Sequence, residues 1–132
     1  MIHILYLAAG QARRFGSNKL LTSYEGKPLY RHGFDAIREA IREREDCTLN
    51  VVTCWDEIAA SVTEDGVRCI LCPDSHLGVS YTIRAGISAV QPLYGGDYLV
   101  FAVADQPHLT AETVAHLLDT AKLHPETACL AY

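Results

Sequence analysis

The stretch that decides the fold is residues 2–10, IHILYLAAG. Segment 2–9 is almost continuously apolar and rich in β-branched and aromatic side chains. An apolar run without alternation is typical of a strand covered on both faces, as in a parallel sheet. Gly10 then opens a polar segment that ends at Lys19. The sequence therefore predicts a first strand that delivers a loop to the carboxyl edge of a sheet.

Beyond this strand, short apolar runs alternate with amphipathic stretches. We expect strands over residues 49–54, 67–72, 98–104 and 128–132, and helices over 29–44, 57–64, 80–90 and from Thr110 to about Pro125. Ser80 and Thr110 are predicted to cap their helices. The alternation predicts an α/β protein, a three-layer α/β/α sandwich with a mostly parallel, Rossmann-like sheet. Because the sequence stops on an apolar strand, we expect this fold to be incomplete at its C-terminus.

Length and composition limit the class of protein. The 132 residues, 49% hydrophobic, predict one domain spanning 1–132. No apolar run approaches the roughly 18 residues of a membrane span. The first residues lack the basic region of an export signal, so a cytoplasmic location is expected.

Charge is unevenly distributed. Residues 1–44 hold eight basic and four acidic side chains, whereas residues 45–132 hold three basic and twelve acidic. A broad nucleic-acid surface needs many phosphate contacts, which this acidic chain does not offer. A small basic pocket for one phosphorylated ligand fits the pattern better. The arginine and glutamate series over 38–45 predicts a solvated helix face with pairs four residues apart.

The five cysteines are an odd number, which argues against a disulfide scaffold. Cys69 and Cys72 have the spacing of a metal or redox pair, but they lie within a predicted buried strand. We expect them to be core residues, with a metal or redox site as the alternative.

Two segments carry candidate chemistry. In residues 7–19, LAAGQARRFGSNK, Gly10 allows close backbone approach, and Arg14 and Lys19 supply charges suited to a polyphosphate. The segment is neither a P-loop nor a dinucleotide fingerprint, and a solvated turn is the alternative.

Asp105 closes the apolar strand 98–104, where a carboxylate suits Mg²⁺; the alternative is a helix cap. His108 is expected to be a surface residue or to touch an acceptor.

These segments resemble a known family. Residues 7–19 resemble the Leu-Ala-Ala-Gly-x-x-x-Arg-Met/Phe-Gly-x-x-Lys signature of the NTP transferases, specifically the molybdenum cofactor cytidylyltransferase branch. Residues 78–87, GVSYTIRAGI, resemble that branch's Gly-x-Ser-x-Ser-Ile-x-x-Gly-Ile segment, and residues 104–107, ADQP, resemble its Asp-Gln/Met-Pro motif. Thr82 and Cys72 depart from the pattern, replacing a Ser and an Asn. Members are also longer, so the chain resembles their N-terminal two-thirds.

The resemblance implies nucleotidyl transfer from an NTP to a phosphorylated, pterin-type acceptor, with release of pyrophosphate. It implies that Arg14, Lys19 and Asp105 are catalytic and that Asp105 holds Mg²⁺. The nucleotide would be bound by Leu7, Ala8, Ala9, Gly10, Lys19, Ser80 and Thr82. Leu-Ala-Ala-Gly, where the guanylyl branch has Leu-Ala-Gly-Gly, favours CTP over GTP. The alternatives are a sugar-phosphate nucleotidyltransferase and a nucleotide-binding module without turnover.

Overall fold

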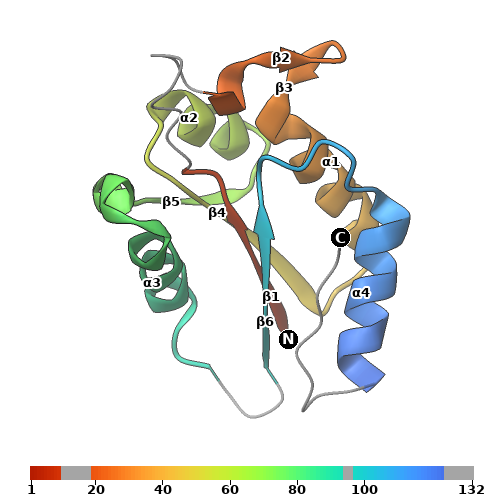
Figure 1. Ribbon diagram of the computed structural model, residues 1–132. Coiled ribbons are helices and arrows are strands. Elements are labelled where there is room, and N and C mark those ends of the chain that lie inside the picture. Colours follow the sequence, from red (N-terminus) through yellow and green to blue (C-terminus); the bar gives the residue numbers. More distant parts are fainter. Residues whose placement is uncertain (10–18, 94–96, 124–132) are drawn as a thin grey trace.

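The computed structural model describes residues 1–9, 19–93 and 97–123. Four parallel strands form its main sheet in the order β5-β4-β1-β6. Their bounds are β1 Ile2–Leu7, β4 Cys47–Thr53, β5 Arg68–Leu71 and β6 Tyr98–Val103. The predicted parallel sheet is thus confirmed, with strands one or two residues shorter or shifted at their ends (Figure 1). The predicted strand 128–132 lies outside the described residues.

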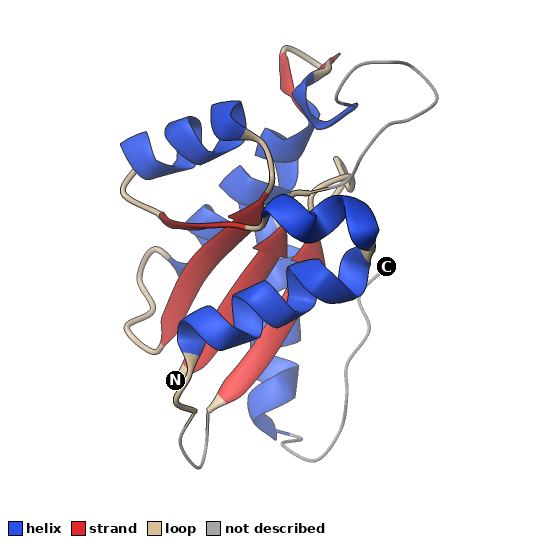
Figure 2. Cartoon of the chain, turned by 90° about the vertical axis from the view of Figure 1, so that its left-hand side faces the viewer, coloured by secondary structure: helices blue, strands red, loops and turns tan. Residues whose placement is uncertain are grey.

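Helices cover both faces of this sheet. Helix α1 (Leu29–Ile41), α2 (Asp56–Glu64) and α4 (Ala111–Leu123) contribute to the larger apolar core on one face. Helix α3 (Val79–Val90) covers the other face, and Figure 2 shows it lying across the strands. The three-layer α/β/α architecture follows from this arrangement. On the α3 face of β6, Phe101 remains 44% exposed.

Two close contacts set how the helices lie on the sheet. The Tyr6 hydroxyl on β1 donates a buried 2.8 Å hydrogen bond to the Tyr30 carbonyl on α1. A Cβ atom at Gly33 would lie 2.6 Å from that hydroxyl oxygen, so α1 can approach β1 only because residue 33 lacks a side chain. On the other face, a Cβ atom at Gly86 would lie 3.1 Å from Leu5, which brings α3 similarly close to the strands.

Short elements that the sequence pattern did not predict precede α1. A 3-10 helix, η1, spans Lys19–Leu21, and the two-residue strands β2 (Ser23–Tyr24) and β3 (Lys27–Pro28) form an antiparallel hairpin. The turn places Glu25 at φ 48° and Gly26 at φ 90°, the left-handed region that glycine adopts at little cost. A further 3-10 helix, η2 (Pro73–Leu77), precedes α3.

Helix ends partly confirm the predicted caps. The Thr110 hydroxyl accepts a 3.1 Å hydrogen bond from the Thr113 amide, so Thr110 caps α4 as predicted. The prediction for Ser80 is wrong, because α3 begins at Val79 and its N-cap is Gly78, at φ 140°. Ser80 lies instead in the first turn of α3.

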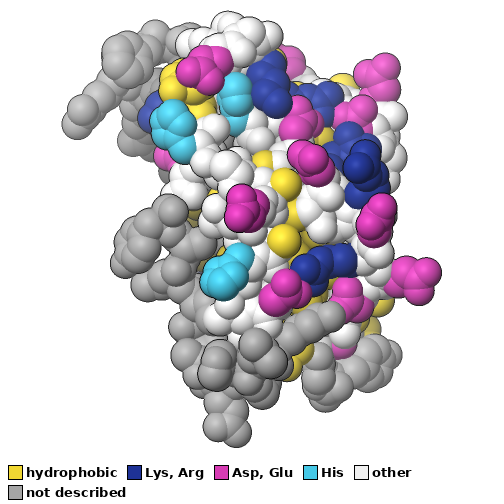
Figure 3. All heavy atoms as spheres, turned by 90° about the vertical axis from the view of Figure 1, so that its right-hand side faces the viewer, with side chains coloured by type: hydrophobic (Ala, Val, Ile, Leu, Met, Phe, Trp, Pro, Cys, Tyr) yellow, Lys and Arg dark blue, Asp and Glu magenta, His cyan; other side chains and the backbone are white. Residues whose placement is uncertain are grey.

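Arg38 and Arg44 do not form the predicted pairs. Arg38 lies 3.6 Å from Asp65 at the end of α2, and Arg44, beyond the end of α1, lies 2.8 Å from Asp119 on α4. The prediction of pairs four residues apart over 38–45 is therefore wrong for these two arginines, because neighbouring helices supply the carboxylates. Figure 3 shows the resulting mixture of basic and acidic side chains on this face of the molecule.

Candidate functional site at the carboxyl edge of the sheet

The strand order brings the ends of β1 and β6 together. The chain runs from β1 outward to β4 and β5 on one side, and then returns through α3 to β6 on the other side of β1. Such a reversal between adjacent parallel strands creates a crevice at their carboxyl ends, where α/β proteins bind ligands. Leu7 is the register partner of Val103, so the segments that follow each strand begin side by side.

The end of β1 is held by hydrogen bonds with the neighbouring strand β4 and with the residue that follows it. The Ala8 amide donates to the Val52 carbonyl (2.8 Å), and the Thr53 hydroxyl donates to the Ala8 carbonyl (2.6 Å). The Cys54 thiol contacts the Ala9 carbonyl oxygen at 3.8 Å. Leu7, Ala8 and Ala9 are all buried. This part of the chain is therefore fixed in position, and it offers small side chains beside any ligand at this edge.

Asp105 follows β6 at the same edge. Its side chain is exposed and forms no hydrogen bond or ion pair within the described part of the chain. Because Thr110 caps α4, Asp105 does not cap that helix, which removes the structural alternative for this carboxylate. A free carboxylate at the end of a parallel strand fits Mg²⁺, which takes one or two protein carboxylates and completes its shell with phosphate and water oxygens.

Within the described ranges, other acidic and metal-binding side chains do not gather around Asp105. Across the described residues, no three His, Cys, Asp or Glu side chains are placed to hold a metal ion together. A metal ion at Asp105 would therefore depend on ligand oxygens for most of its coordination.

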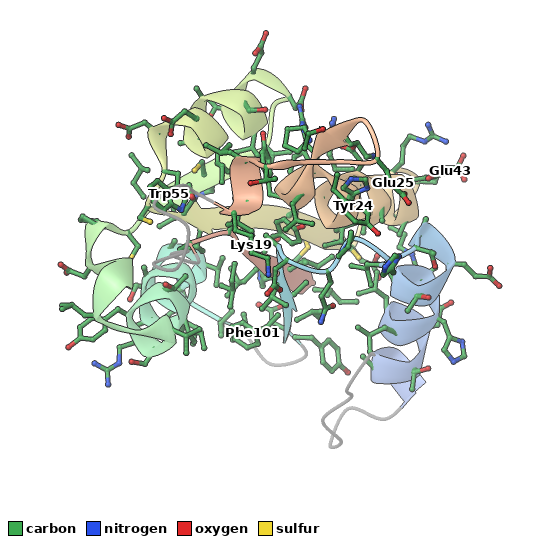
Figure 4. The ribbon with its side chains drawn as sticks, turned by 45° about the horizontal axis from the view of Figure 1, so that its top comes forward. Lys19, Tyr24, Glu25, Glu43, Trp55 and Phe101 are labelled. Carbon is green, nitrogen blue, oxygen red and sulfur yellow. The ribbon has the colours of Figure 1, made fainter. Side chains whose placement is uncertain are left out.

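Lys19 extends from η1 above this edge of the sheet. In Figure 4, which brings the edge forward, Lys19 lies between Trp55 on one side and Tyr24 on the other. Its side chain is exposed and pairs with no carboxylate of the described residues. An unpaired ammonium group at the crevice is available to an anionic ligand. Gly10 and Arg14 lie outside the described residues.

The predicted nucleotide-binding segment 78–87 reaches the carboxyl edge of the sheet at the N-terminal turn of α3. Ser80 is exposed there, whereas Thr82 is 3% exposed and packs into the core. The buried Cys72 thiol donates to the Tyr81 carbonyl at 3.6 Å, which ties the end of β5 to this turn. Of the two hydroxyls, only that of Ser80 is placed to reach a ligand without rearrangement.

Cys69 and Cys72 lie on opposite faces of the sheet, which decides between a core role and a metal or redox site. Cys69 packs with the α1, α2 and α4 core, while Cys72 belongs to the α3 core. Both are free thiols, and burial raises the pKa of Cys69. Because the two sulfurs lie on opposite faces, they cannot chelate one metal ion or form a disulfide. The prediction of core cysteines is confirmed.

Three residues of this edge escaped prediction. Thr53 ends β4, and its hydroxyl accepts a hydrogen bond from the Trp55 amide (3.1 Å) while donating to Ala8. The ring of Tyr24 meets His32 and His108 edge-on, with ring centroids 5.3 and 6.0 Å apart. Tyr24 thereby links the hairpin after Lys19 to the loop after Asp105. Thr53 could have been predicted as a site residue, because it is a polar residue at the end of an apolar strand. No local sequence pattern distinguishes Tyr24.

The strand order and the helices on both faces of the sheet define the class of a doubly wound, parallel α/β domain. The family described as MobA-like NTP transferase domain matches residues 4–132, and the chain belongs to that family. No helix in the described ranges combines the length and apolarity that crossing a membrane requires.

Similar proteins agree with this assignment. The chain is 28% identical over 131 residues to the purine catabolism protein PucB of Bacillus subtilis, covering 93% of this chain and 60% of PucB. It is 30% identical over 124 residues to the bifunctional protein GlmU of Mycobacterium ulcerans, covering 89% of this chain and 25% of GlmU. The chain thus spans less than two-thirds of the length of PucB and about a quarter of that of GlmU.

Solved structures share the fold. Rv0371c from Mycobacterium tuberculosis superposes with a TM-score of 0.68 at 23% identity, covering 92% of this chain and 60% of that one. CMP:2-keto-3-deoxy-manno-octonic acid synthetase, complexed with CTP, superposes with a TM-score of 0.71 at 19% identity, covering 95% of this chain and 48% of that one. These similarities confirm the predicted architecture.

Proposed function

We propose that this chain binds a nucleoside triphosphate at the carboxyl edge of its sheet and takes part in nucleotidyl transfer. The adjacency of the β1 and β6 ends carries the proposal, since it brings Leu7–Ala9 to one crevice with the carboxylate of Asp105, which has no partner among the described residues. Membership of the MobA-like NTP transferase family supports the same reaction class.

Each residue has a role that follows from its chemistry. The small side chains of Ala8 and Ala9 leave room for the base and phosphates beside the backbone. Lys19, and Arg14 by its place in the motif, would offset the charge of the triphosphate and of the leaving pyrophosphate. Ser80 and Thr82 would hydrogen-bond the nucleoside; Thr82 needs a local shift to do so because it is buried.

Asp105 would hold Mg²⁺, which when bound neutralises charge on the triphosphate. The acceptor phosphate is already anionic, so the chain needs no general base. An acceptor oxygen attacks the α-phosphorus in line, a new P–O bond forms, and the bond to the β-phosphate oxygen breaks to release pyrophosphate. The contribution of the protein is positioning and charge neutralisation.

For the substrates, we propose CTP in preference to GTP and a phosphorylated, pterin-type acceptor such as molybdopterin. Support comes from the LAAG sequence at 7–10 and from a structural neighbour that holds CTP. The name of that neighbour, an octonic acid synthetase, keeps a sugar-type acceptor as the second candidate.

Binding and turnover should be measured separately. Calorimetric titration of the chain with CTP, GTP and ATP, each with Mg²⁺ or with EDTA, tests the site; we expect Mg²⁺-dependent binding that is tightest for CTP. Pyrophosphate release with molybdopterin or a sugar phosphate as acceptor then tests the reaction. Binding without release for any acceptor would identify a nucleotide-binding module, and absence of NTP binding would contradict the proposal altogether.

A further inference from the structure

A second polar site lies at the opposite, amino end of the sheet. On the α3 face, Leu5 in the middle of β1 and Val52 near the carboxyl end of β4 belong to the apolar core. Toward the strand beginnings the same face becomes polar, with His3 beside Thr48 and Asn50 beside Arg68 in the strand register. Helix α3 ends at Val90, and an open groove of about 620 Å³ lies between its C-terminus and these four residues.

The polar side chains of this groove are linked in a chain. The Asn50 side-chain amide donates to the Thr48 hydroxyl at 3.3 Å, and that hydroxyl lies 3.0 Å from His3 Nδ1. On its other side, His3 Nε2 lies 3.8 Å from a carboxylate oxygen of Asp97. These contacts hold His3 and Thr48, so neither side chain is free to turn away from the groove.

Two groups of the groove have no partner among the residues that the structure describes. Asn50 is only 4% exposed, and its amide oxygen accepts no hydrogen bond from any described residue. The guanidinium group of Arg68, on the neighbouring strand, forms no ion pair with the described residues. Buried polar atoms are normally hydrogen-bonded, so a buried, unpartnered amide oxygen beside a free guanidinium group indicates a ligand.

The chemistry of these groups defines that ligand. Arg68 favours a carboxylate or phosphate, which it can bind through two parallel hydrogen bonds. The Asn50 oxygen requires a hydrogen-bond donor, and so do the last carbonyl groups of α3, which carry the negative end of the helix dipole. The volume of the groove is within the range of small-molecule sites.

We propose that this groove binds a small polyhydroxylated anion, a sugar acid or a sugar phosphate, with its charged group on Arg68 and its hydroxyls on Asn50 and the end of α3. The site is separate from the carboxyl-edge crevice. His3 and Ala8 are five residues apart on one extended segment, which places the two sites about 16–17 Å apart at roughly 3.3 Å per residue.

Four probes separate the parts of the proposal: gluconate and glucose 6-phosphate carry both hydroxyls and charge, sorbitol carries only hydroxyls, and inorganic phosphate carries only charge. Chemical shifts of the backbone and side-chain amides are followed during titration of the chain. We expect gluconate or glucose 6-phosphate to shift the side-chain amide signals of Asn50 and the backbone signals of residues 66–68 and 89–91. The anion that binds more tightly identifies the charged group, while sorbitol and phosphate should bind at least about tenfold more weakly.

Variants complete the test. Arg68→Gln, at an exposed position, and Asn50→Leu, of similar side-chain size, should each weaken binding at least about tenfold. Arg42→Gln, which removes an exposed arginine on the other side of the sheet, should not change it. Lys19→Ala should also leave it unchanged, which separates this groove from an NTP site. Unchanged affinity in Arg68→Gln, shifts confined to the carboxyl edge, or no response to gluconate and glucose 6-phosphate at millimolar concentration would overturn the proposal.

Discussion

The backbone amide of Ala104 donates a 3.1 Å hydrogen bond to the carbonyl oxygen of Leu7. This bond extends the parallel β1–β6 ladder by one step beyond the strands themselves. Ala8 and Ala104 therefore leave the sheet side by side, although they are almost a hundred residues apart in the chain, and Asp105 follows directly. If Asp105 holds Mg²⁺, this bond sets the position of the metal ion relative to the loop that carries Lys19.

Lys19→Ala should weaken NTP binding without affecting folding, because the side chain is exposed and unpaired in the described residues. A hydrogen bond to a charged group contributes about 1.5–3 kcal/mol, so the dissociation constant should rise roughly tenfold to a hundredfold. Calorimetric titration with CTP and Mg²⁺ measures it. Lys27→Ala is the matched control, since Lys27 forms an exposed pair with Asp35 at 2.9 Å. Equal affinities in Lys19→Ala and the parent would remove Lys19 from the site.

Asp105→Asn should retain the fold, since the two side chains have nearly the same shape and Asp105 is exposed. The amide is a poor ligand for Mg²⁺, so the Mg²⁺ concentration needed for half-maximal NTP binding should increase at least about tenfold. Asp119→Asn, an equal change of charge on α4, serves as the control. If the Mg²⁺ dependence of Asp105→Asn overlays that of the parent, the carboxylate does not bind the metal.

Thr53→Val should destabilise the protein and disturb the site together. It removes the donor to the Ala8 carbonyl and the acceptor for the Trp55 amide, and each unsatisfied buried group costs about 1–3 kcal/mol. Urea unfolding measures the free energy of unfolding, and CTP titration below the transition measures the site. Thr53→Ser, which keeps the hydroxyl, should recover most of both. A Val variant as stable as the Ser variant would show that these hydrogen bonds contribute little.

Gly33→Ala should lower stability even though alanine is the better helix former by about 1 kcal/mol. The new Cβ would lie 2.6 Å from the Tyr6 hydroxyl oxygen, and such overpacking costs about 1–3 kcal/mol. The same substitution in a Tyr6→Phe background should cost less, because the clashing oxygen is gone. A double-mutant cycle by urea unfolding measures the difference; equal costs in both backgrounds would contradict the close contact between α1 and β1.

Acid should weaken the contact between α1 and α2. The hydrogen bond from Arg31, 2.5 Å from Asp65, lowers the pKa of that carboxyl. Because the folded pKa lies below the unfolded one, the stabilisation is complete above the ordinary carboxyl pKa of about 4 and is lost as the pH falls through the folded value. Free energies of unfolding measured from about pH 6 to pH 2 should fall less steeply in Asp65→Asn than in the parent. Glu64→Gln, an exposed neighbour, should follow the parent; identical slopes in all three would exclude the pair.

The sequence by itself determined the order of the main strands and helices along the chain. It also pointed to the carboxyl ends of the strands as the place of the candidate site residues. Local patterns suffice for this: the apolar run 2–9, the amphipathic helix before residue 42, and Thr110 as a cap all depend on neighbours within a few residues. Even Cys69 and Cys72 were assigned to the core from their strand alone. Elements too short to show a period, such as β2 and β3, could not be found in this way.

Only the tertiary structure decided which strands are neighbours. A parallel strand pair forms between distant segments, and nothing local in residues 98–103 says that they lie against β1 and not against β5. That choice creates the crevice, brings Asp105 near the end of β1, and gives Thr53, Trp55 and Tyr24 their contacts. It also leaves Asn50 and Arg68 side by side past the end of α3. Local propensity fixes the elements, but burial and hydrogen bonding between distant segments fix the sites.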